Sequence, residues 1–289
     1  MIEANDGKSH QEAHQEARSR RRPAPYADVP AAPFQPGPAG THITIRGLCK
    51  YFAGWPLYEN FDLDIPKNKI VSIFGPNGCG KSTLINMIAG LVPIDRGEIL
   101  FDGKSLRDTR VGYVFQNYRE ALFPWMRTID NIAYPLILEG KSKAEIDRRM
   151  AELVASFDVR FDLKRYPYEL SGGQQQTASI MRALAPGPEV LFLDEPFSAL
   201  DFEMTLFIRE KLQEVFMQTG TTMMLVSHDL EEAVYLADYV LLLTKRPTRV
   251  AEMLSYDAAR PRTVDTLSQP QFIETKKESL RIFQKEMRR

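Results

Sequence analysis

A glycine-rich segment between two apolar runs constrains this sequence more than any other feature. The segment GPNGCGKST (75–83) follows the run IVSIF (70–74) and precedes the run LINMIAGL (84–91). Short runs of branched apolar residues are typical of buried strands, and an amphipathic or apolar run after a turn suits a helix. A strand that passes into a helix through the pattern G-x-x-x-x-G-K-S/T predicts a loop that wraps a phosphate group. The chain is therefore expected to have an α/β fold.

The residue types of this loop each have a physical role in binding phosphate. Its glycines allow backbone geometries and close approaches that a Cβ would prevent. Successive N–H groups then face the phosphate, with support from the N-terminus of the following helix. Lys81 is placed to reach the β- and γ-phosphates, and Ser82 offers its hydroxyl to Mg²⁺. The predicted binding set is Gly75, Pro76, Asn77, Gly78, Cys79, Gly80, Lys81, Ser82 and Thr83.

Further apolar runs indicate a parallel sheet surrounded by helices. They are rich in Val, Ile, Leu and Phe, which suits strands buried on both faces. Helical patterns cover 143–157 and 202–219, and the stretch from about 117 to 180 has little strand signal, so we expect a helical insertion there. The segment HITIRGL (42–48) alternates as an exposed or edge strand does. The buried runs are VGYVF (111–115), VLFL (190–193), MMLVS (223–227) and YVLLL (239–243).

Two adjacent carboxylates end one of these runs. Asp194 and Glu195 follow VLFL directly and precede Pro196. Neighbouring side chains on a strand point to opposite faces, but a turn at the carboxyl end of a parallel strand brings both into the ligand crevice. We expect Asp194 to serve Mg²⁺ through its water shell and Glu195 to act as general base on an attacking water. The alternative is a pair of solvated carboxylates.

The segment LSGGQQQ (170–176) predicts the start of a helix. Ser171 and Gln174 have the spacing of a capping box. Two glycines in a first turn cost about 1 kcal/mol each relative to alanine, so capping alone does not explain Gly172 and Gly173. We interpret them as exposing backbone N–H groups to an anion.

Composition excludes several classes of protein. The chain has 37 basic and 38 acidic residues, and this near-neutral charge argues against a protein that coats nucleic acid. Its two cysteines, Cys49 and Cys79, are too few for a disulfide framework and favour a reducing compartment. We expect neither a membrane span, which needs roughly 18 apolar residues in a row, nor a secretory signal, since residues 1–22 are polar.

Seven segments, in this order over about residues 41–245, resemble the ATP-binding subunits of ATP-binding cassette (ABC) transporters. The resemblance implies an α/β, P-loop NTPase (RecA-like) core with an antiparallel β subdomain and a helical insertion subdomain at about 117–185. A proline-rich tail at 1–40, expected to be disordered, and a C-terminal extension at 246–289 flank it. The segments are an aromatic after Lys50, the phosphate loop, Gln116, LSGGQ, VLFLDEP, SALD (198–201) and His228.

The resemblance implies a head-to-tail homodimer that sandwiches ATP. Ser171, Gly172 and Gly173 of one copy would contact the γ-phosphate held by the other, with Gln174 in the same binding segment. Asp201 would cross the dimer interface.

The resemblance also gives roles to four residues within one copy. Phe52 occupies the adenine-stacking position, with Tyr51 as the alternative, and plain core packing is the other interpretation of Phe52. Gln116 would contact Mg²⁺ and the attacking water and sense the membrane subunit, unless it is a solvated loop residue. His228 would hold the γ-phosphate and the catalytic water, unless it is purely structural.

The family's partners and location follow from the same resemblance. They are membrane permease subunits and, indirectly, a solute-binding protein, with the cassette at the cytoplasmic face of the cell membrane as a peripheral subunit. LFPW (122–125) and RPTRV (246–250) narrow the likeness to importers of the nitrate, sulfonate and taurine group. No nucleic-acid partner is expected.

The rival classes are a soluble ABC protein acting on DNA or ribosomes, a P-loop GTPase and a degenerate regulatory cassette. The chain lacks tandem cassettes and the base-reading N-K-x-D motif, and it retains every catalytic position.

Three departures and one thiol complete the predictions. Thr177 stands where the family usually has arginine, the loop NYREALFP (117–124) differs from the usual importer loop, and relatives do not generally have the 40-residue tail. Residues 271–289 carry a charge of +3, six basic minus three acidic, and predict a surface helix, with a membrane-proximal or dimer contact as the alternative. Cys79 lies near a helix N-terminus and Lys81, conditions that lower a thiol pKa, so one hypothesis is an alkylation-sensitive group shielded by ATP. The favoured interpretation is a small residue that the loop tolerates.

Overall fold

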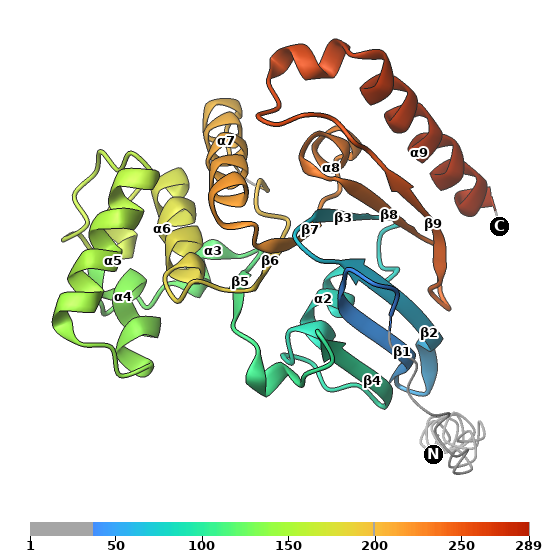
Figure 1. Cartoon of the computed structure of the whole chain (residues 1–289), viewed down its shortest axis with the longest axis horizontal. Coiled ribbons are helices and arrows are strands. Elements are labelled where there is room, and N and C mark those ends of the chain that lie inside the picture. The colour runs from blue at the N-terminus through green and yellow to red at the C-terminus, as the bar shows by residue number, and fades with distance from the viewer. Residues whose placement is uncertain (1–36, 199, 289) are drawn as a thin grey trace, which may run out of the picture.

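The computed structural model describes residues 37–198 and 200–288, which build two sheets and the helices around them (Figure 1). Residues 1–36 of the predicted tail lie outside the described residues, and residues 37–40 lead into the first strand. In the described part of the chain, no helix has the length and apolar character needed to cross a membrane.

The main sheet has six strands in the order β5-β6-β7-β3-β8-β9. Five are parallel and coincide with the predicted apolar runs, and every residue of β3, β6 and β7 is buried, which explains why these runs do not alternate. The last strand pairs antiparallel with β8, so the segment after residue 245 continues the sheet. The bounds are β3 (Ile70–Phe74), β5 (Val111–Val114), β6 (Val190–Asp194), β7 (Thr222–Val226), β8 (Tyr239–Leu243) and β9 (Val250–Ser255).

A second, antiparallel sheet has the order β2-β1-β4, from β1 (Thr41–Phe52), β2 (Trp55–Pro66) and β4 (Arg96–Phe101). The prediction that 42–48 forms an exposed or edge strand was wrong, because β1 is the central strand. His42 and Thr44 supply the polar half of the alternation, yet both are buried. His42 Nδ1 lies 2.7 Å from Thr222 Oγ1 of the main sheet, so a hydrogen bond takes the place of solvent.

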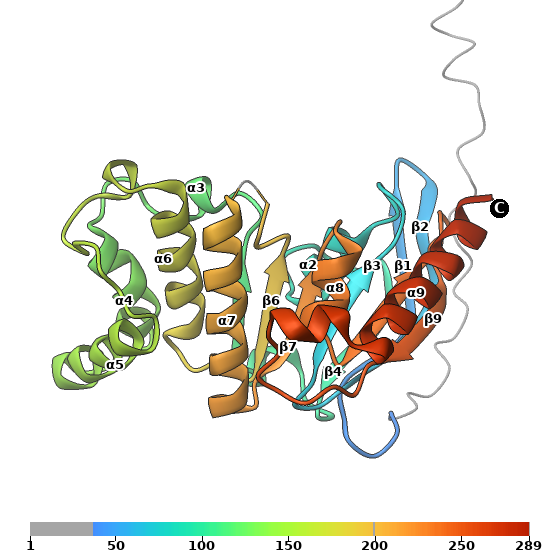
Figure 2. The same cartoon turned by 90° about the horizontal axis from the view of Figure 1, so that it is seen from above.

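The helices form groups around the main sheet. Helix α2 (Lys81–Ile88) follows β3, and the helices between β5 and β6 stand at the end of the molecule away from the antiparallel sheet (Figure 2). Helix α7 (Phe202–Thr219) lies between that group and the sheet (Figure 2). The helices between β5 and β6 are α3 (Tyr118–Ala121), α4 (Thr128–Leu138), α5 (Lys143–Ser156) and α6 (Gly172–Leu184), and short 3₁₀ helices cover Leu106–Asp108, Pro167–Glu169 and Val264–Ser268.

A buried arginine anchors the C-terminal segment to this core. Arg262 Nη1 donates to the carbonyls of Tyr235 (2.9 Å) and Ala237 (2.6 Å), where helix α8 (Leu230–Leu236) ends. The Gln213 side chain of α7 pairs with both main-chain groups of Arg262, at 2.8 and 3.1 Å. Burial lowers the pKa of Arg262 to about 10. Helix α9 (Pro270–Arg288) then packs along α8, β8 and β9, so residues 246–288 are an integral part of the fold (Figure 1).

Candidate functional site

The glycine-rich loop connects β3 to α2, as its sequence predicts. Gly78 and Gly80 have φ values of 73° and 105°, which side chains with a Cβ rarely adopt. The Lys81 side chain is buried, and its ammonium group donates to the carbonyls of Gly75 (2.9 Å) and Pro76 (3.2 Å). The loop therefore curls around a buried cation.

Asp194 and Glu195 face the same region because the chain turns between them. Strand β6 ends at Asp194, and Glu195 has a left-handed backbone with φ 47°. In an extended strand, the side chains of Asp194 and Glu195 would point to opposite faces of the sheet. The left-handed backbone at Glu195 instead turns both carboxylates toward the same region. Ser82 Oγ donates to Asp194 Oδ1 at 2.8 Å and joins the phosphate loop to β6. Burial raises the pKa of Asp194, the hydrogen bond from Ser82 opposes that shift, and the charge of Glu195 adds to it.

Sequence reasoning missed two residues beside Asp194. Tyr113 Oη donates to Asn86 Oδ1 at 2.7 Å and lies 3.5 Å from Asp194 Oδ2. Burial raises the pKa of Tyr113, and the Asp194 carboxylate adds to this shift, so the phenol stays a hydrogen-bond donor. In the sequence, Tyr113 stands out as a polar residue within the apolar run VGYVF. Asn86 likewise interrupts the apolar run LINMIAGL.

Three of the predicted catalytic side chains meet at one carboxylate oxygen. Gln116 Nε2 donates to Glu195 Oε2 at 2.8 Å, and His228 Nδ1 lies 3.4 Å from the same oxygen. Gln116, Glu195 and His228 follow strands β5, β6 and β7, which are neighbours in the sheet, so the parallel topology brings their carboxyl ends together. Gln116 is exposed but not merely solvated, because Glu195 accepts its amide hydrogen.

The segment LSGGQ begins helix α6 with a complete capping box. Ser171 Oγ accepts from the Gln174 N–H at 3.3 Å, and Gln174 Oε1 accepts from the Ser171 N–H at 3.0 Å. Packing within this chain also requires the two glycines. A Cβ on Gly172 would lie 2.7 Å from Tyr118 Oη, and one on Gly173 would lie 2.6 Å from Met204 Cγ. The interpretation that an anion alone explains these glycines was therefore incomplete.

Within one copy, the LSGGQ segment and the phosphate loop belong to separate parts of the molecule. Helix α6 stands with the helical group beside α7, whereas α2 lies by β3 and the antiparallel sheet (Figures 1 and 2). Asp201 caps α7 by accepting the N–H of Met204 at 2.8 Å, and Thr177 Oγ1 donates to the Gly173 carbonyl at 2.9 Å. In the isolated chain, Asp201 therefore stabilises the start of α7, and Thr177 bonds within its own helix.

Phe52 ends strand β1 with its ring 48% exposed, so the alternative of plain core packing was wrong. Lys50 Nζ lies 5.4 Å from the centre of this ring and is held by the Pro93 carbonyl and Asp95. The neighbouring Tyr51 is half-buried, so Phe52 offers the more accessible ring.

The hypothesis of an activated thiol at Cys79 was wrong, and the favoured interpretation of a tolerated small residue fits its position. Its side chain is only 2% exposed, and burial raises its pKa, although Lys81 acts in the opposite direction. The glycine-rich loop turns the thiol inward against the core, where the thiolate is disfavoured.

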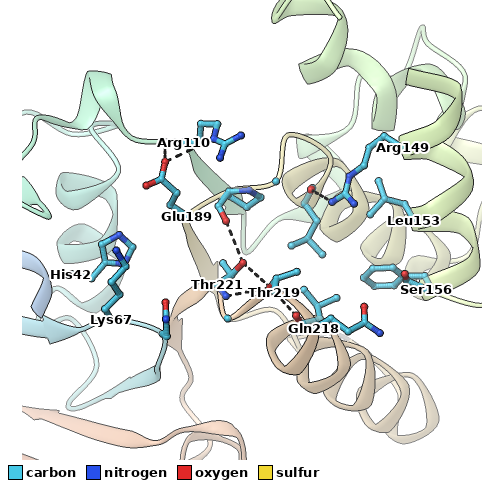
Figure 3. Close-up of a pocket in the computed structure, with 17 residues that line it drawn as sticks. His42, Lys67, Arg110, Arg149, Leu153, Ser156, Glu189, Gln218, Thr219 and Thr221 are labelled. Atoms are coloured by element: carbon cyan, nitrogen blue, oxygen red, sulfur yellow. Dashed lines mark hydrogen bonds and ion pairs between the residues drawn. The ribbon is translucent and has the colours of Figure 1, made fainter. Parts of the chain in front are cut away.

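A cavity of about 340 Å³ opens at the other edge of the main sheet (Figure 3). It lies at the amino ends of β3, β5, β6 and β7 and contains none of the predicted site residues. Its charged groups have partners within the chain: Arg149 donates to the carbonyls of Leu184 and Ala185, and Arg110 pairs with Glu189. The candidate site is thus at the carboxyl edge of the sheet.

Comparisons with known proteins identify the family of this chain. Residues 58–198 match the family model described as "ABC transporter". The chain is 42% identical over 210 residues to a sulfate/thiosulfate import ATP-binding protein from Neisseria meningitidis, a match that covers 70% of this chain and 58% of that protein. It is 39% identical over 220 residues to the taurine import ATP-binding protein TauB from Escherichia coli, covering 75% of this chain and 86% of TauB.

A solved structure shares the fold. The dimeric, post-hydrolysis ATP-binding cassette MJ0796, bound to ADP and Pi, superposes with a TM-score of 0.66 at 28% identity and covers 75% of this chain and 100% of that one. The chain therefore has the α/β fold of the P-loop ATPase cassettes, and its extensive match to TauB makes the family assignment firm. This chain belongs to the ABC transporter family and is one of its ATP-binding cassettes.

Proposed function

We propose that this cassette hydrolyses ATP to power uptake of a small solute through a separate membrane permease. The observation that carries the proposal is the convergence of Gln116 and His228 on Glu195 Oε2. Glu195 acts as general base toward a water, Gln116 and His228 position that water, and His228 also holds the γ-phosphate. Residues 75–83 bind the phosphates, with Lys81 as the cation, and Phe52 stacks on the adenine.

The oxygen donors beside Lys81 fit Mg²⁺. Ser82 Oγ and Asp194 Oδ1 are 2.8 Å apart, and both are hard ligands of the kind that this ion prefers. No group of three or more His, Cys, Asp or Glu able to hold a metal occurs among the described residues. That suits an ion held by one or two side chains together with the phosphates of ATP. When bound, the ion neutralises phosphate charge, and Gln116 is its third proposed contact in the protein.

A second copy completes the site in this proposal. Ser171–Gln174 lie away from the phosphate loop of their own chain, and the similar cassette MJ0796 is dimeric with ADP and Pi. Head-to-tail pairing places the N-terminus of α6 on the γ-phosphate held by the partner, with Asp201 at the interface. Helix N-termini attract anions, so this arrangement stabilises the ATP-bound dimer.

The helical group offers the surface for the permease. Trp125 and Leu138, both in this group, are apolar and 72% and 71% exposed. Trp125 follows the segment 117–124, which comes directly after Gln116, so a permease seated there would be linked to the catalytic cluster. The cassette is then peripheral at the cytoplasmic face, with a solute-binding protein as an indirect partner and no nucleic acid.

We propose that the transported solute is a small molecule of the nitrate, sulfonate and taurine group. The similar proteins carry the names of sulfate/thiosulfate, taurine and spermidine/putrescine importers, at 42%, 39% and 39% identity. Cassettes this similar serve different solutes, so the permease makes the choice.

Replacement of Glu195 tests the hydrolytic role. We expect Glu195→Gln to bind ATP normally and to lose about 10²–10⁴-fold in turnover, the range that acid–base groups contribute. Glu252→Gln, on an exposed position of β9, is the matched control and keeps wild-type turnover. Wild-type turnover in purified Glu195→Gln protein would falsify the assignment of the base.

A further inference from the structure

Three consecutive carbonyl oxygens of the phosphate loop accept hydrogen bonds from side chains outside the loop. Arg246 Nε donates to the Gly78 carbonyl at 2.6 Å, and Thr248 Oγ1 donates to the Cys79 carbonyl at 2.5 Å. Tyr58 Oη donates to the Gly80 carbonyl at 2.9 Å. We call these three donors the loop brace. They come from β2 and from the turn between β8 and β9, which contains most of the segment RPTRV (246–250).

The brace acts on the N–H groups of the loop through the peptide planes. A trans peptide unit is planar, so its C=O and its N–H point in opposite directions. Fixing the carbonyls of Cys79 and Gly80 from outside therefore fixes the N–H groups of Gly80 and Lys81 toward the inside of the loop. The N–H of Cys79 instead donates to the Pro76 carbonyl, so Arg246 stabilises the apex of the loop.

Two members of the brace are fully buried. Tyr58 and Thr248 form an isolated parallel bridge between β2 and the turn that joins β8 to β9. The Thr248 N–H donates to the Leu57 carbonyl at 2.8 Å. The Leu57 side chain in turn limits the space at Gly80, where a Cβ would lie 3.0 Å from a leucine methyl carbon. Buried hydroxyls held in this way orient their acceptor without loss of side-chain freedom on ligand binding.

We propose that Tyr58, Thr248 and Arg246 are positioning residues that hold the phosphate loop in its ATP-binding form. This inference rests on the proposed binding of ATP phosphates by residues 75–83. The brace touches the loop from outside and reaches ATP only through the peptide planes of the loop.

Variants that remove single hydroxyl groups test the proposal. Tyr58→Phe and Thr248→Val keep the buried volume and lose one donor each. We expect KM and Kd for ATP to rise about 3–10-fold in each, the change that one hydrogen bond of ordinary strength produces, while kcat at saturating ATP stays within about twofold. Thr248→Ser restores both constants because it keeps the hydroxyl. The exposed Arg246→Gln, which leaves the core untouched, raises KM in the same direction.

A matched control separates positioning from general stability. Tyr256 is also fully buried, and its hydroxyl has no hydrogen-bond partner in the described part of the chain, so Tyr256→Phe removes a buried hydroxyl far from the loop's carbonyls. We expect it to keep the wild-type KM. For the brace variants, we expect a smaller rise in melting temperature on addition of ATP, an effect that a uniform loss of stability does not produce.

Lys81→Ala distinguishes the two proposals. Loss of ATP binding in Lys81→Ala together with wild-type KM and Kd in Tyr58→Phe, Thr248→Val and Arg246→Gln overturns the brace and leaves the proposed function intact. Wild-type ATP binding in Lys81→Ala overturns the proposed function of the loop and the brace with it.

Discussion

Gln116 Nε2 donates a hydrogen bond to Glu195 Oε2 at 2.8 Å, across 79 positions of sequence. Gln116 also directly precedes the loop 117–124, which leads to the exposed Trp125. The proposed general base is therefore tied to the surface on which a permease would be seated.

Removal of this amide is expected to slow hydrolysis more than it weakens ATP binding. A hydrogen bond to a charged group contributes about 1.5–3 kcal/mol, which is about 10–100-fold in rate if the bond positions Glu195 in the transition state. Steady-state kinetics of Gln116→Ala should show this loss in kcat, with Kd for ATP within about twofold. An unchanged kcat would mean that the hydrogen bond to Glu195 has no part in turnover.

The packing of Gly172 predicts a rescue between two residues. Gly172→Ala places its Cβ against Tyr118 Oη, and such overpacking costs about 1–3 kcal/mol in the free energy of unfolding. Tyr118→Phe removes the clashing oxygen, and that buried hydroxyl has no hydrogen-bond partner among the described residues. Chemical denaturation should therefore find the double variant near wild-type stability. If the double variant is as unstable as Gly172→Ala, the clash is not the cause.

Arg262 should be among the residues on which folding depends most. Arg262→Met leaves carbonyls at the end of α8 and part of Asp238 without their donor, and breaking a buried ionic network of this kind costs about 3–5 kcal/mol. Arg281→Met is the matched control, because that arginine pairs with Glu278 on the exposed side of α9. Urea unfolding should show a large loss for the first variant and none for the second. Equal midpoints would contradict the anchoring role.

His42 predicts a loss of stability in mild acid. Burial lowers its pKa from 6.5; Asp102 and Glu189 act against the shift and Lys67 adds to it. Because the folded state binds the proton less tightly than the unfolded state, this stability is fully present above pH 6.5 and is lost as pH falls through the lowered pKa.

The measurement for His42 is the free energy of unfolding at pH 7.5 and at pH 5.0. His42→Asn keeps a hydrogen-bonding group toward Thr222 but does not titrate there. We expect the wild type to lose more stability than His42→Asn over this interval. Parallel losses would assign the acid sensitivity to other groups.

Local patterns anticipated much of this fold because they record interactions between chain neighbours. The five buried runs became β3, β5, β6, β7 and β8. The capping spacing of Ser171 and Gln174 became a real helix start. The same reasoning failed for β1, where alternation does not distinguish solvent from a buried partner such as Thr222.

The sequence by itself determined the phosphate loop, the order of its partner motifs and the kind of chemistry they support. Spacing and residue type suffice for these, because each motif is built from residues adjacent in the chain. Only the tertiary structure decided that Gln116 and His228 meet at Glu195, that Tyr118 and Met204 require Gly172 and Gly173, and that burial suppresses the thiolate of Cys79. These relationships join residues on different strands and helices. The distances between such residues depend on strand order and packing, which are not encoded locally in the sequence.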